Sequence, residues 1–346
     1  MNTQIIIWVF ISVAVFGAFW AIPITDDYKN YMGGTRLWLS GETRLYDGPE
    51  TEFYYLPWSL CITALLSWLP DRIGQAILNL ASFWAILVSL RVLVRKIPWW
   101  GIFMVLANLF TINLFFTAQW DALILAAVTA AWWAVQTKKP LVLGLAFLLM
   151  ATKPTNIILP AIMILVAFLK ERRTRDLLVP LGVILFGVAW SFWACGFDWP
   201  VRYLAYIREY SPPSLYNISI WRLGDWFGID PVVLYLFSGL VGIWLGWVFI
   251  RLRINAVTLS MALVANLVLS PYVVSYHYII AAPMFVWIAR KKVVWAVGIY
   301  GIMILLFLHV ADLIQIPPIY FIYPLSILVA GVVLTIFYPK LAKESP

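Results

Sequence analysis

Long apolar runs recur from one end of this chain to the other, and they constrain its fold more than any other feature. The first run is IIIWVFISVAVFGAFWAIP, residues 5–23. A helix needs about 20 apolar residues to cross the ~30 Å hydrocarbon core of a bilayer. Of the 346 residues, 64% are hydrophobic and 12% charged, whereas soluble domains carry about 25% charged residues. The pattern therefore predicts an all-α polytopic membrane protein.

Short basic clusters between these runs predict the orientation, because Lys and Arg accumulate in cytoplasmic loops. One threading puts every cluster inside, with about twelve spans and both termini cytoplasmic. The predicted spans lie near 5–23, 74–94, 99–117, 121–136, 140–152, 155–169, 177–195, 232–250, 256–270, 277–289, 293–310 and 320–338. This placement explains the net charge of +8, so no nucleic-acid partner is predicted.

Residues 53–70, FYYLPWSLCITALLSWLP, are apolar but do not fit this threading as a full crossing. We interpret the segment as a re-entrant or interface-lying helix on the outer side. The outer face then has two large loops, 24–73 and 196–231, which contain most of the acidic residues. Neither loop has the composition of a separate domain, and we expect one membrane domain over residues 1–346.

The first outer loop begins with two adjacent carboxylates, Asp26 and Asp27. The residues that follow predict an amphipathic helix in the membrane interface. Its expected apolar face comprises Tyr28, Tyr31, Met32, Thr35, Trp38 and Leu39. One aspartate suffices to cap the free N–H groups of a helix. We therefore expect a catalytic role for the other.

Polar residues also stand at the outer ends of later spans. Gln119 and Asp121 precede one apolar run, and Lys153 lies between two others. A lysine at this depth is costly without a partner. A phosphate suits its compact charge, and a lone interfacial lysine is the alternative.

The second outer loop mixes arginines, Arg222 among them, with many aromatic residues. Such a mixture suits a sugar phosphate or ordinary interface anchoring. Asn217 begins a short N-glycosylation sequon. His277, between Tyr276 and Tyr278, is either a structural residue or part of a polar site.

Several segments, taken in order, resemble glycosyltransferase family 87. These are the polyprenol-phosphate-mannose-dependent mannosyltransferases of the GT-C superfamily. The segments are DYKNYMGGTRLWLSGETRLYD with FYYLPWSLCITALLSWLP, then TAQWDALILAA, ATKPTNIILP and LSPYVVSYHYIIAAP. The chain departs from the family pattern at Ala118, where the family has Gly, and at Asp121, where it has Asn. It also has Leu56-Pro57 where Pro-Pro is frequent.

The resemblance implies a GT-C-type bundle and an inverting hexosyltransferase of the cell membrane. The enzyme would move a sugar, mannose first, from a polyprenyl-phosphate donor to a lipid-linked or cell-envelope glycan acceptor on the extracytoplasmic face. Asp27 would be the general base, and Lys153 and Arg222 would stabilise the leaving phosphate. The implied substrate-binding set is Asp26, Tyr31, Gln119, Asp121, Lys153, Asn217, Arg222, His277 and Tyr278.

For Asp26, the sequence leaves three roles open: a hydrogen bond to the sugar, a helix cap, or the base itself. We favour the cap. No cofactor is expected besides the lipid-linked donor. A divalent metal is not expected either, although Asp121 would be its acidic ligand.

A transporter or flippase is the main alternative, because charged residues near spans also mark transport pathways. Such proteins often contain paired repeats with broken helices, which are not recognisable in this sequence. The acid-rich first outer loop also has no explanation in a transporter. A non-catalytic membrane scaffold is the third possibility.

Overall fold

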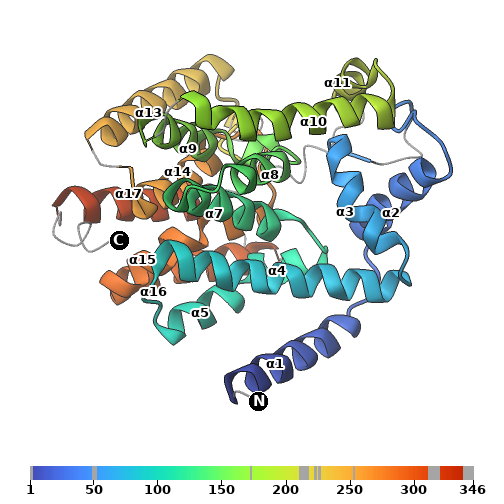
Figure 1. Ribbon diagram of the computed structural model, residues 1–346. Helices are drawn as coiled ribbons and strands as arrows, with labels where there is room; N and C mark the ends of the chain where they lie inside the picture. Colours follow the sequence, from blue (N-terminus) through green and yellow to red (C-terminus); the bar gives the residue numbers. More distant parts are fainter. Residues whose placement is uncertain are drawn as a thin grey trace.

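The computed structural model describes residues 3–48, 53–171, 174–209, 218–221, 224, 227–251, 254–310 and 320–337. Within these ranges the protein consists of α-helices and short 3₁₀ turns, without a strand (Figure 1). The all-α prediction is therefore confirmed. The helices not discussed individually below are α1 (Thr3–Trp20), α8 (Pro140–Met150), α9 (Ile158–Glu171), α11 (Trp199–Glu209), α15 (Ala282–Lys291), α16 (Val293–Val310) and α17 (Ile322–Phe337).

Three of the described helices are long and apolar enough to cross a membrane on their own. They are α4 (Asp71–Val94), α10 (Leu178–Cys195) and α13 (Pro231–Arg251), the last over Pro231–Ile250. Most other apolar helices contribute apolar stretches of 10–17 residues, such as Ile6–Trp20 of α1 and Val293–Leu306 of α16, and α5 and α6 form a bent pair. By length and composition, three or four spans are supported, and the twelve-span bundle stays a prediction.

The bent pair replaces the single span expected over 99–117. Helices α5 (Trp99–Leu106) and α6 (Leu109–Phe116) meet at 54°. Asn108 caps α6 by accepting from the Phe110 N–H, and its Nδ2 donates to the Tyr323 hydroxyl at 2.8 Å. The Tyr300 hydroxyl donates to the Ala107 carbonyl at 3.1 Å. Polar groups at the break are thus paired with side chains from elsewhere in the bundle, the condition under which such breaks occur at membrane depth.

Helix α14 (Ala256–Leu269) forms the centre of the main hydrophobic core. Every residue from Ala256 to Val268 is buried. A helix without a polar face is expected inside such a core or within a membrane. α14 packs against α9, α13 and α17, and against the 3₁₀ turn η6 (Ser275–Ala281).

A second, aromatic core includes rings of residues 24–73, the predicted first outer loop, where α2 (Asp26–Leu39), α3 (Leu60–Ser67) and α11 gather at the right of Figure 1. Its buried rings are Tyr28, Tyr31, Tyr46, Phe53, Tyr55, Trp120, Trp199 and Tyr206. A Cβ on Gly74 of α4 would lie 2.0 Å from the Tyr28 hydroxyl oxygen. Glycine at this position therefore lets α2 approach α4.

Helix α2 confirms the predicted amphipathic helix in the first outer loop. It buries Tyr28, Tyr31, Met32 and Thr35 as expected, but Leu39 at its end is 48% exposed. The following apolar segment is helical only over Pro57–Ser67. At 1.5 Å per residue this stretch is too short to cross a bilayer, in agreement with a segment that does not span.

Candidate functional site

The chain enters α2 along a path held by a buried glutamine of α4. Gln75 Nε2 donates to the Pro23 carbonyl at 2.9 Å, and Gln75 Oε1 accepts from the Thr25 N–H at 2.9 Å. The Thr25 hydroxyl accepts from the Tyr28 N–H at 3.3 Å. Thr25 is therefore the helix cap, and the assignment of that role to Asp26 was wrong. A hydroxyl one residue earlier occupies the capping position.

The two adjacent aspartates face different surroundings. The side chain of Asp26 is 92% exposed and pairs with Lys29 Nζ at 2.8 Å. The side chain of Asp27 turns inward, where its Oδ2 accepts from Gln119 Nε2 at 2.8 Å. Asp27 is therefore the carboxylate that the fold places among polar side chains from other segments.

Burial is the largest influence on the pKa of Asp27 and raises it above the ordinary value of 3.8. The hydrogen bond from Gln119 and the charge of Lys153 act in the opposite direction without cancelling this rise, and the charges of Asp26 and Asp121 add to it. A carboxylate with a raised pKa is a stronger base than a solvated one. This property is typical of carboxylates that accept a proton in catalysis.

Gln119 owes its position to the end of α6. The Gln119 N–H donates to the Leu114 carbonyl at 3.0 Å, and the Ala118 N–H donates to the Phe115 carbonyl at 3.3 Å. This pair of bonds defines a Schellman motif, in which the residue at the Ala118 position takes a left-handed conformation. Ala118 has a φ of 52°, where glycine is the usual residue. The turn directs the chain from α6 into α7 (Asp121–Thr137).

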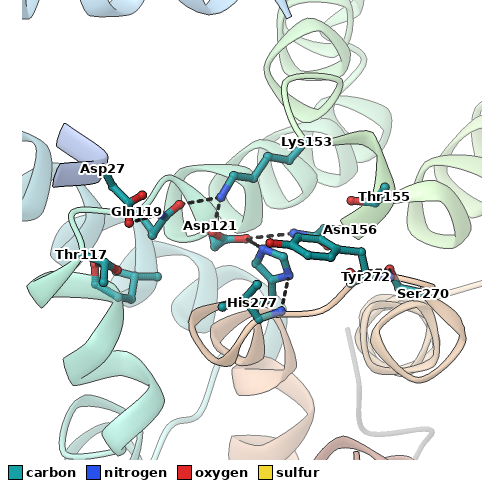
Figure 2. A network of polar contacts seen from close by, with 12 residues as sticks. Asp27, Thr117, Gln119, Asp121, Lys153, Thr155, Asn156, Ser270, Tyr272 and His277 are labelled. Atoms are coloured by element: carbon teal, nitrogen blue, oxygen red, sulfur yellow. Dashed lines mark hydrogen bonds and ion pairs between the residues drawn. The ribbon is translucent and has the colours of Figure 1, made fainter. Parts of the chain in front are cut away.

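Lys153 joins Gln119 to Asp121. Its Nζ donates to Gln119 Oε1 at 2.7 Å and to Asp121 Oδ2 at 2.8 Å (Figure 2). The Asp121 side chain is fully buried and that of Lys153 is 13% exposed. The ammonium also lies 5.5 and 5.0 Å from the ring centroids of Tyr55 and Tyr276. The costly lysine therefore has a carboxylate partner within the protein.

The other oxygen of Asp121 faces two further donors. Asn156 Nδ2 lies 3.0 Å from Asp121 Oδ1, and His277 Nε2 lies 3.7 Å from it. His277 Nδ1 accepts from the Val274 N–H at 3.2 Å. A neutral imidazole whose Nδ1 accepts has its proton on Nε2, which is the nitrogen facing Asp121. Asp121 thus faces three donors that come from two segments, residues 153–156 and the turn η6.

A buried asparagine of α14 fixes the segment that contributes Lys153 and Asn156. Asn266 Nδ2 donates to the Thr155 carbonyl at 2.8 Å, and Asn266 Oδ1 accepts from the Leu159 N–H at 3.0 Å. These bonds satisfy backbone groups where the 3₁₀ turn η3 (Pro154–Asn156) leads into α9. The main core therefore determines the position of the backbone from which the Lys153 side chain extends.

Most of the site residues expected from the sequence meet in one network. Asp27, Gln119, Asp121, Lys153 and His277 are linked by the contacts above. Tyr31 adjoins them, because its hydroxyl lies 3.1 Å from that of Tyr55, which is 3.3 Å from Gln119 Oε1.

Two expected residues, Tyr278 and Asp26, do not join this network. The Tyr278 hydroxyl donates to the Tyr320 carbonyl at 3.0 Å, and its ring packs on Phe110. Asp26 faces solvent, as described above. Asn217 and Arg222 lie outside the described residues, so their predicted roles stay predictions.

Sequence reasoning missed Tyr55, Asn156 and Tyr276 as members of the site. The signal for each was proximity to a quoted motif: Tyr55 precedes Leu56-Pro57, Asn156 follows Lys153-Pro154, and Tyr276 adjoins His277. Over the described part of the chain, no group of three or more His, Cys, Asp or Glu side chains is arranged to hold a metal ion.

A family model described as glycosyltransferase family 87 matches residues 53–275, more than half of the chain. Gln119, Asp121 and Lys153 lie within the matched region, whereas Asp27 lies 26 residues before it and His277 two residues after it. No curated protein and no solved structure matches the chain.

Proposed function

The chain belongs to glycosyltransferase family 87, and from this premise we propose which sugar it transfers, from what donor and with which residues. The proposed donor is a polyprenyl-phosphate hexose, with mannose as the sugar. The proposed acceptor is a lipid-linked or cell-envelope glycan, and the reaction takes place on the extracytoplasmic face of the cell membrane.

The observation that carries this proposal is the continuous polar chain from Asp27 through Gln119 to Lys153. These residues come from separate segments, 92 and 34 positions apart along the sequence. The side-chain amide of Gln119 thus bridges a carboxylate able to accept a proton and a buried ammonium. Transfer of a sugar from a phosphate requires this combination, because one reactant loses a proton while the other leaves as an anion.

In the proposed reaction, Asp27 takes the proton of the acceptor hydroxyl as the hydroxyl oxygen attacks C1 of the sugar. A new C1–O bond forms on the face opposite the phosphate, and the bond from C1 to the phosphate oxygen breaks. The configuration at C1 is inverted. The bonding electrons leave with the polyprenyl phosphate, and the proton remains on Asp27.

Lys153 is the proposed electrostatic partner of the leaving phosphate. An ammonium has three N–H donors. Gln119 and Asp121 accept two of them. The third is available to a phosphate oxygen. Pairing with Asp121 keeps the lysine charged and in place before the donor arrives, so little reorganisation is needed during the reaction.

The remaining expected ligands surround this pair. His277 and Tyr31 lie at the edges of the network, where they are proposed to contact the phosphate or the sugar hydroxyls. Arg222 and Asn217 are proposed to contribute from the second outer loop. Asp121 is proposed to hold Lys153 and not to touch substrate, because both of its oxygens already accept hydrogen bonds, from Lys153 and Asn156.

Purified protein in liposomes with radiolabelled polyprenyl-phosphate-mannose and a panel of glycolipid acceptors provides the test. Asp27→Asn is expected to lower the transfer rate by about 10²–10⁴-fold, with binding of the donor retained. Asp26→Asn is the matched control and is expected to retain activity, because its carboxylate faces solvent. Full activity of Asp27→Asn would exclude it as the base, and movement of donor across the bilayer without sugar transfer would support the transporter alternative.

A further inference from the structure

We propose that Gln119 is a positioning residue that holds Asp27 as a carboxylate with one oxygen free for the acceptor, and that Lys153 fixes Gln119 in the orientation this requires. The inference rests on the proposed role of Asp27 as base. It gives Gln119 a role different from the substrate contact expected from the sequence.

The first step concerns the orientation of the Gln119 amide. An ammonium can only donate hydrogen bonds, so the atom 2.7 Å from Lys153 Nζ must be the amide oxygen. The amide NH₂ must then face Asp27, at 2.8 Å from Oδ2. Turning the amide over would set N–H groups against the ammonium and an oxygen against the carboxylate. Two repulsive contacts would replace two attractive ones.

The second step concerns what this orientation does to Asp27. A hydrogen bond from an N–H group favours the ionised form of a carboxyl group. Burial opposes ionisation at the same position. Gln119 therefore counteracts burial without bringing a full charge next to the base. A lysine at that distance would neutralise the carboxylate far more strongly and weaken it as a base.

The third step concerns the other oxygen of Asp27. Gln119 binds Oδ2, and Oδ1 has no hydrogen-bond partner among the described residues. Because the Asp27 side chain is only partly buried, Oδ1 is the oxygen that an acceptor hydroxyl is expected to reach. Fixing Oδ2 thus orients Oδ1.

The other ionisable groups near Asp27 are accounted for as follows. Asp26, on the same helix, and Asp121 of α7 oppose its ionisation, whereas Lys153 favours it. Nearby phenols come from the two outer-loop segments and from the segment before η6. They are Tyr31, Tyr55, Tyr272 and Tyr276. Phenols are neutral below about pH 9, so they do not titrate together with Asp27.

The test is an infrared titration of reconstituted protein, in which the carboxylic C=O band lost in Asp27→Asn identifies Asp27. In Gln119→Met this band is expected to appear at a pH higher by about one to two units, the equivalent of one hydrogen bond to a charged group. Gln136→Met is the matched control. It places the same substitution at the exposed far end of α7 and is expected to leave the band unchanged.

Gln119→Glu is the second variant, in case Gln119→Met does not fold. It keeps an acceptor for Lys153, loses the donor to Asp27, and is expected to move the band at least as far. Where transfer is measurable, the acidic limb of kcat/KM should move with the band. Gln119→Asn is expected not to restore the wild-type band position. Its side chain is shorter, so its amide does not reach both Asp27 and Lys153.

An Asp27 band that titrates at the wild-type pH in both folded variants would overturn the proposal. The outcome is independent of the proposed function. If the band shifts but the wild type transfers no sugar, the positioning role stands and the proposed function fails. If Asp27→Asn abolishes transfer but the Gln119 variants leave the band and the pH profile unchanged, the proposed function stands and the positioning role of Gln119 fails.

Discussion

Removal of the lysine charge is the sharpest perturbation of this site, because it leaves a fully buried carboxylate without its counter-ion. We predict that Lys153→Met destabilises the protein by about 3 kcal/mol. Breaking a buried ion pair by removing one partner costs about 3–5 kcal/mol. The lower end applies here because Asp121 keeps Asn156 at 3.0 Å and faces His277 at 3.7 Å.

The assay is unfolding by SDS in mixed micelles, followed by the fluorescence of the 20 tryptophans. Asp121→Asn, made together with Lys153→Met, removes the stranded charge and should recover most of the lost stability. The coupling between the two substitutions is then about 2 kcal/mol, within the range for residues in direct contact. The double variant should fold but transfer sugar poorly, which separates the structural role of Lys153 from its proposed role at the phosphate.

Lys29→Met is the matched control. Its partner Asp26 is 92% exposed, and exposed pairs contribute little to stability. A Lys153→Met protein as stable as Lys29→Met would refute the reasoning. So would a double variant that is less stable than Lys153→Met alone.

Two further predictions concern the proposed base, Asp27, and the turn at Ala118 that precedes Gln119. The acidic limb of kcat/KM should lie above pH 3.8, the ordinary aspartate value, because burial raises the pKa of Asp27. Only the ionised form accepts a proton, so activity is lost as the pH falls through the raised pKa. A limb at or below the ordinary value in the pH–rate profile would contradict this cause. Ala118→Gly should stabilise the protein by up to about 1.5 kcal/mol, since the left-handed conformation costs alanine roughly 1–2 kcal/mol and glycine loses about 0.5–1 kcal/mol through unfolded-state entropy. Ala118→Val should destabilise it in the same SDS titration, and equal stability of the two variants would show that the turn is not strained.

The membrane class, most helix positions and the amphipathic helix of the first outer loop followed from the sequence. These features depend on hydrophobic periodicity, which is local and readable from neighbouring residues. The polar motifs in that loop and in the later segments indicated glycosyltransferase family 87, and the match over residues 53–275 confirmed that family. Local patterns and ordered motifs were sufficient for these conclusions.

Local patterns did not reveal which polar groups are partners. Asp26 was expected to cap α2, but Thr25 occupies the capping position because Gln75, 50 positions away, holds its backbone. Lys153 was expected to pair with a phosphate, and the sequence did not reveal that Asp121 is its partner within the protein. The single span expected over 99–117 is bent, and at its break side chains from distant helices pair with the Ala107 carbonyl and with Asn108.

The sequence by itself thus determined what kind of protein this is and which polar residues were candidates for chemistry. Only the tertiary structure decided that Asp27 turns inward, that Gln119 lies between it and Lys153, and that Tyr278 faces elsewhere. The physical reason is the separation of the partners along the chain. Contacts across 92 and 34 residues form only after the helices have packed, and no short stretch of sequence encodes them.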